Sequence, residues 1–135
     1  MSFRFVLIIL LSLVVAAGAG WFAGASGRAA VELARDRMEL RAEFAESRAL
    51  ILDARLSLIH SNFGDAVERF QRARTLIGRV QTRVREIGQV EQAGRLEIAL
   101  SHLADAQRLS ATFDVARADA AAEESLKALQ SAGGS

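Results

Sequence analysis

The chain has 135 residues, a formal net charge of +1, and no proline, cysteine or tyrosine. Without cysteine it has neither a disulfide framework nor a thiolate metal site, and without a basic excess it lacks the charge that draws proteins to nucleic acid. The abundant alanine, leucine, arginine and glutamate favour helices. The composition therefore predicts an all-α fold and argues against a nucleic-acid partner.

The first predicted element is an apolar helix at residues 5–23, a stretch without a charged residue. At 1.5 Å per residue such a helix reaches roughly 28 Å, which is close to the thickness of a bilayer's hydrocarbon core. Trp21 and Phe22 stand near its end, where aromatic side chains favour the membrane interface. We therefore expect residues 1–27 to form a single-pass transmembrane anchor in contact with the lipid bilayer.

Small residues recur at every fourth position of this helix, in one stripe: Ser12, Ala16, Gly20 and Gly24. Because small side chains let helices approach closely in lipid, the stripe predicts a packing surface for other membrane helices. A second interpretation stays open for the same segment. Ala23-Gly24-Ala25 before Ser26 resembles a signal-peptidase site, so the alternative to an anchor is a cleaved secretory signal.

The orientation of the anchor depends on the charges that flank it. A signal anchor with a very short N-terminal tail usually keeps that tail in the cytoplasm, whereas Arg28, Arg35, Arg37 and Arg41 beyond the anchor weigh the other way. We favour a bacterial inner-membrane protein whose C-terminal domain is periplasmic.

Residues 28–131 are predicted to form one interaction domain of two long antiparallel helical hairpins, followed by a disordered tail at 132–135. Apolar residues alternate spacings of four and three along the first two helices, and we expect these two seams to face each other. The first seam comprises Met38, Ala42, Ala45, Ala49, Leu52, Leu56, Ile59 and Phe63, and the second Ala66, Phe70, Ala73, Ile77, Val80, Val84 and Ile87. Two later helices carry Leu96, Ala99, Leu103 and Ala106, and then Val115, Ala122, Leu126 and Leu129.

Residues 50–73 resemble a tetratricopeptide-type helical hairpin. Phe63, Ala66, Phe70 and Ala73 match the family's pattern after the turn, and Ala54 stands where the first helix needs a small residue. A fainter copy follows about fifty residues later, where Phe113-Asp-Val-Ala116 echoes Phe63-Gly-Asp-Ala66. The family's first-helix aromatic and closing proline are absent, and the spacing exceeds its usual period of about 34. The resemblance implies a tetratricopeptide-like scaffold that binds peptides or other subunits.

The sequence offers no set of residues for catalysis, for a cofactor or for a metal. His60 and His102 are the two histidines, and neither has the ExxH or HxxxH spacing that brings ligands together on a helix. No glycine-rich phosphate loop is present, and no serine has a base and an orienting group at a suitable spacing. We therefore expect neither an enzyme nor a small-molecule substrate.

Basic residues gather on the second helix of the predicted domain, and Arg69, Arg72, Arg79 and Arg83 are the candidate surface for an acidic partner. Together with the anchor, this surface suggests a non-catalytic scaffold or accessory subunit that stabilises a larger membrane protein complex, for example a respiratory or photosynthetic one. The alternative is a membrane-tethered, tetratricopeptide-like adaptor or chaperone that binds client peptides.

Overall fold

The computed structural model describes the backbone of residues 3–134 and the side chains of residues 30–134. Over this range the chain forms four helices and no strand: α1 (Phe3–Ile59), α2 (Phe63–Glu86), α3 (Val90–Ala111) and α4 (Val115–Gly133). It divides into two units, Met1–Met38 and Glu39–Ser135. The predicted all-α fold is confirmed.

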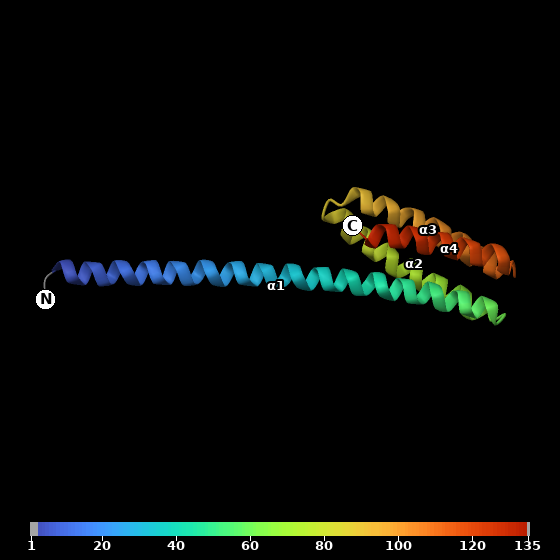
Figure 1. The fold of residues 1–135 in the computed structure, drawn as a ribbon, viewed down its shortest axis with the longest axis horizontal. Helices are drawn as coiled ribbons and strands as arrows, with labels where there is room; N and C mark the ends of the chain where they lie inside the picture. Colours follow the sequence, from blue (N-terminus) through green and yellow to red (C-terminus); the bar gives the residue numbers. More distant parts are fainter. Residues whose placement is uncertain (1–2, 135) are drawn as a thin grey trace. The chain divides into compact units, whose positions relative to one another are not determined.

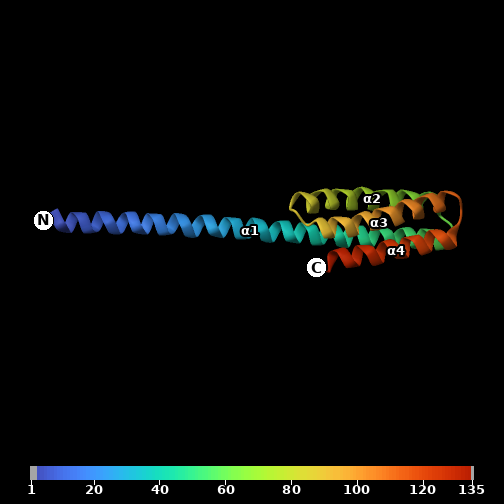
Figure 2. The ribbon, with the colours of Figure 1, turned by 90° about the horizontal axis from the view of Figure 1, so that it is seen from above.

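The second unit is a four-helix bundle, in which α1 from Glu39 onwards, α2, α3 and α4 lie side by side and alternate in direction (Figures 1 and 2). Helix α3 packs against both α2 and α4. Helix α4 also contacts α1, where Arg55 Nε donates a hydrogen bond of 2.6 Å to Asp119 Oδ1. This arrangement is compatible with the predicted pair of helical hairpins.

The three turns of the bundle share one backbone geometry. Each turn contains one residue with positive φ: Ser61 at 58°, Gly88 at 80° and Phe113 at 62°. At each turn, two backbone N–H groups donate back to carbonyls of the last helical turn, as when Ser61 N donates to Leu58 O and Asn62 N to Ser57 O. This is the Schellman arrangement, which satisfies carbonyls that would otherwise lack partners.

The residue after each positive-φ position is the N-cap of the next helix. Asn62, Gln89 and Asp114 are the N-caps of α2, α3 and α4, and the side chains of Asn62 and Asp114 accept hydrogen bonds from backbone N–H groups three residues later. These turns contain only three residues each, so consecutive helices must run antiparallel.

The structure places the internal repeat at a spacing of 52 residues, which corrects the predicted match. Phe113 occupies the position of Ser61 in its turn, Asp114 that of Asn62, and the buried Ala118 that of the buried Ala66. Ala116, which the sequence pairs with Ala66, is exposed. The two-residue error arose because the aromatic residues stand out in sequence, whereas the turn conformation and the buried alanine define the equivalence.

Helix α1 carries two seams of largely apolar residues. The prediction of which one enters the core is wrong. The buried or half-buried seam consists of Leu40, Phe44, Ser47, Ile51, Ala54 and Leu58. The predicted seam instead faces outwards, with Leu52, Leu56 and Ile59 exposed by 42%, 53% and 68%. Both seams alternate spacings of four and three, but over residues 40–59 the buried one has four large side chains and the outer one three, so burial of the first removes more apolar surface from water.

The apolar residues of the other three helices lie largely as predicted. Phe70, Ile77 and Val80 of α2 are buried together with Leu96 and Leu103 of α3, in the cluster that forms the core, although Ile87 is exposed. In α4 the predicted Ala122, Leu126 and Leu129 are buried and Val115 is half-buried.

The end of the chain differs from the prediction of a disordered tail at 132–135. Helix α4 continues to Gly133, and Ala132 is fully buried in the core. Gln92 Nε2 donates to Ala132 O at 2.6 Å, and Arg95 Nη1 donates to Ser131 O at 2.7 Å. These side chains of α3 supply the partners that the last carbonyls of a helix lack.

Among the residues whose side chains are described, no helix offers a stretch of the length and apolar character required to cross a membrane. The predicted anchor at 5–23 lies outside those residues. The same holds for the predicted packing stripe and interface aromatics: Ser12, Ala16, Gly20, Gly24, Trp21 and Phe22.

Candidate interaction surfaces

The outer α1 face, defined here as Ala42, Ala45, Ala49, Leu52, Leu56 and Ile59, is apolar and exposed. It lies opposite the buried seam of α1, because residues of the two seams are offset by about half a helical turn. Single exposed apolar residues are normal in soluble domains, but six on one continuous stripe are not. Nothing in the described part of the chain covers this stripe, which makes it the first candidate for a partner.

Charged residues border the outer α1 face, with opposite signs on its two edges. Glu46 and Asp53 follow the side nearer α2, where Asp53 Oδ2 lies 3.1 Å from Arg69 Nη1. Arg41, Arg48 and Arg55 follow the side nearer α4. Arg55 is held by Asp119, whose hydrogen bond raises the pKa of the guanidinium. Of the described side chains on these edges, the exposed Arg41, Glu46 and Arg48 take part in no ion pair.

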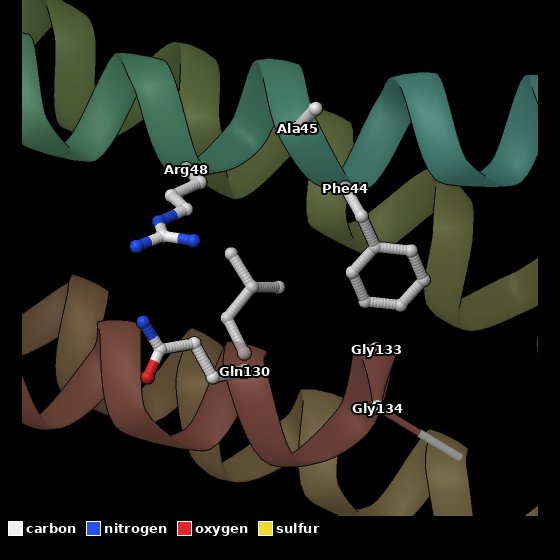
Figure 3. A pocket seen from close by; sticks show the side chains of 7 residues that line it. Phe44, Ala45, Arg48, Gln130, Gly133 and Gly134 are labelled. Carbon is white, nitrogen blue, oxygen red and sulfur yellow. The ribbon is translucent and has the colours of Figure 1, made fainter.

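A shallow pocket of about 290 Å³ lies between α1 and α4, on the arginine side of that face (Figure 3). Its lining comprises Phe44, Ala45, Arg48, Leu129, Gln130, Gly133 and Gly134. Phe44 extends from α1 towards the end of α4, and a Cβ on Gly133 would stand 3.4 Å from its ring. Arg48 and Gln130 reach from opposite helices towards each other at the other end of the pocket (Figure 3). An apolar floor with polar groups at one end suits a protruding apolar side chain of a partner.

The candidate basic surface of α2 is mostly paired within the chain. Arg69 Nε donates to Asp65 Oδ2 at 2.7 Å, Arg72 pairs with Glu68 at 2.6 Å, and Arg83 lies 3.2 Å from Glu43. Arg79, also exposed, is the one member of the predicted set without an ion pair among the described residues. An acidic partner would therefore compete with existing carboxylates for three of the four arginines.

A polar cluster joins α1 to α2 at their turn. The hydroxyl of Ser57 donates to Asp65, and Arg69 bridges Asp65 and Asp53. The hydrogen bond from Ser57, followed by the one from Arg69, lowers the pKa of the Asp65 carboxyl below its ordinary value. Because every member of the cluster has a partner in the chain, it serves the α1–α2 hairpin and leaves no group free for chemistry.

The two histidines lie apart and are not brought together with other ligands: His60 is exposed at the end of α1, and His102 is half-buried on α3. Within the described residues, no three histidine or acidic side chains are grouped so as to hold a metal ion. At the same end of the bundle as His60, the rings of Phe63 and Phe113 meet edge to face with centroids 4.9 Å apart. This contact links the two hairpins.

Sequence reasoning named the residues of the outer α1 face but assigned them to the core. The signal that separates the two seams is side-chain size in their first half, where the buried seam has Leu40 and Phe44 but the outer face has only alanines. The pocket between α1 and α4 could not be anticipated, since it depends on which helix closes the bundle. Comparison of the chain with models of protein families, with curated proteins and with solved structures finds no match.

Proposed function

We propose that this protein is a non-catalytic, membrane-anchored scaffold: an accessory subunit that helps to hold a larger membrane protein complex together. The outer α1 face carries the proposal, because an exposed apolar stripe bordered by charges is the anatomy of a protein interface. The charge-free segment at 5–23 supports a membrane anchor, with the C-terminal bundle on the periplasmic side of a bacterial inner membrane.

The choice between a scaffold and an enzyme follows from what the surfaces offer. Polar groups at the turn cluster and along α2 are paired with one another, and the pocket between α1 and α4 presents an aromatic ring, aliphatic groups and one guanidinium. Such groups recognise the side chains of another protein but supply no nucleophile with its base. The partners that fit are other membrane protein subunits, such as those of respiratory or photosynthetic assemblies.

A test begins with the full chain, untagged at its N-terminus, extracted from its own membrane in mild detergent and identified together with its companions by mass spectrometry. We expect other subunits in fixed proportion to a chain of uncleaved mass. In a Leu52→Glu variant these companions should be lost, since a charge would enter the apolar interface. Ile98→Glu is the matched control, because Ile98 of α3 has a similar exposure, 54% against 42% for Leu52.

Two results would refute the scaffold proposal. A processed chain that lacks residues 1–27 would remove the anchor, and a full chain that leaves the membrane without companions would remove the accessory role. Equal losses for Leu52→Glu and Ile98→Glu would show that the charge disturbs the bundle itself, and that the outer α1 face is no interface.

The second candidate is a tethered, tetratricopeptide-like adaptor for client peptides, and the pocket between α1 and α4 favours it. A peptide could place an apolar side chain beside Phe44 and an acidic group near Arg48. This candidate predicts transient binding of many peptides that a Phe44→Ala substitution weakens, whereas the scaffold predicts a stable complex of fixed composition.

A further inference from the structure

We propose that the outer α1 face is a parallel coiled-coil interface between two copies of this chain. The inference rests on the proposed function in one respect, namely that this face serves assembly; it adds that the partner seated there is a second α1. Three observations support it: the spacing of the apolar residues, the signs of the charges on the two edges, and the absence of competing partners for three of those charges.

The spacing of the outer α1 face is that of a two-stranded coiled coil. In heptad notation, Ala42, Ala49 and Leu56 occupy a positions, and Ala45, Leu52 and Ile59 occupy d positions. The helix is continuous over these residues, and all six side chains are exposed. A stripe at this period is the seam along which two helices pack, each side chain entering a gap between four side chains of the partner.

The charges specify the partner. The e positions of these heptads carry Glu46 and Asp53, and the g positions carry Arg41, Arg48 and Arg55. In a parallel pair in register, each g residue faces the e residue of the next heptad on the other copy, so Arg41 meets Glu46 and Arg48 meets Asp53. In an antiparallel pair, arginines would face arginines and carboxylates would face carboxylates. The sequence of one helix is thus complementary to a parallel copy of itself.

The rest of the bundle leaves these charges available. Exposed Arg41, Glu46 and Arg48 have no ion pair within the described chain, and the Asp53 side chain is half-exposed despite its contact with Arg69. Arg55 is excluded from the scheme because Asp119 and Glu123 already hold it. Helices α2 and α4 flank the opposite half of α1, so a second copy can approach the seam with its own bundle directed away.

The interface is short and alanine-rich, which sets its strength. Residues 42–59 span roughly 27 Å of helix, and a seam of this length between two helices buries less than the roughly 800 Å² per partner of a standard interface. Three of the six seam residues are alanine, which lets the helices approach closely but contributes little apolar area. Two chains anchored in one membrane with the same orientation would meet at high effective concentration and only in the parallel arrangement.

Disulfide trapping in the membrane tests this interface directly, because the chain has no cysteine of its own. Single substitutions Ala45→Cys and Ile59→Cys place a thiol at d positions four turns apart. In a parallel pair in register each thiol lies beside its own copy, so both variants should give a disulfide-linked dimer on mild oxidation. Exposed Ile98→Cys, on α3, is the control and should stay monomeric.

The outcomes separate the alternatives. An antiparallel pair can bring only one position opposite its own copy, so a dimer from one of the two variants alone would overturn the parallel arrangement. No dimer above the level of Ile98→Cys would overturn the interface altogether. Because trapping is local, association of the predicted membrane segments alone would not produce the expected result.

A charge exchange tests the register. Arg41→Glu or Glu46→Arg alone should reduce the trapped Ala45→Cys dimer roughly three- to tenfold, since each creates two like-charge contacts across the symmetric pair. The two exchanges combined should restore it, and failure to recover would refute the pairing of Arg41 with Glu46. A stoichiometric complex with other subunits but a single copy of this chain would refute the dimer and leave the proposed function intact, while a trapped dimer without other subunits would do the reverse.

Discussion

At the scale of single residues, the three turns differ in how well their residues suit one backbone conformation. Ser61, Gly88 and Phe113 all adopt positive φ, which glycine reaches without strain and residues with a Cβ do not. Ser61→Gly should therefore raise the free energy of unfolding by about 1 kcal/mol, and Gly88→Ala should lower it by about the same amount. Urea unfolding of the full chain in mild detergent measures both; a loss of stability in Ser61→Gly would contradict the turn geometry.

The carboxyl of Asp65 makes stability depend on pH in the acid range. Its pKa is lower in the folded protein than the ordinary value of 3.8, so between the two pKa values the unfolded chain binds more protons. The contribution of Asp65 is complete above the unfolded pKa and disappears as the pH falls through the folded one. Asp65→Asn should be less stable than the parent chain at neutral pH, and the difference should shrink below about pH 4.

The Ser57→Ala variant serves as the companion to this measurement. It removes the largest cause of the lowered Asp65 pKa while keeping the salt bridge to Arg69, so its pH dependence should fall between those of the parent and Asp65→Asn. A stability difference between parent and Asp65→Asn that does not change with pH would refute this account.

At the scale of elements, two adjacent residues of α1 lie on its opposite faces and should differ in their effect on stability. Ile51 is fully buried and Leu52 is 42% exposed. Ile51→Ala should lower the free energy of unfolding by about 2–5 kcal/mol, because it leaves a cavity in the core. Leu52→Ala should change it by less than about 0.5 kcal/mol at protein concentrations too low for association. Similar effects for the two variants would contradict the assignment of the faces.

The sequence predicts the number and type of the bundle helices well and their packing only in part. Spacings of three and four identify helices locally, and for α2, α3 and α4 most of the apolar residues at these spacings are buried. In α1 two stripes satisfy the same rule, and the choice between them depends on the volumes of Phe44, Ile51 and Leu58 against neighbouring helices. The pocket beside Phe44 depends on the closure by α4 and has no local signal.

At the scale of the whole molecule, one helix contributes to both units and presents its two seams to different partners. The buried seam of α1 binds the remainder of its own chain, and the proposed coiled coil would bind another copy. Because one face of α1 serves the fold and the other would serve assembly, no additional domain is needed for the second role. The bundle and the proposed dimer would then use opposite faces of one helix.

The closure of the bundle by α4 has a consequence for how the chain folds. The hydrogen bonds from Arg55 to Asp119 join residues 64 positions apart, more distant than those that link α2 to α3 or α3 to α4. Closing so long a loop carries the larger entropic cost, so contacts between consecutive helices should form first and those between α1 and α4 last. Until that step the side of α1 that packs on α4 faces water together with the outer α1 face, and newly made chains are most prone to aggregate in this interval.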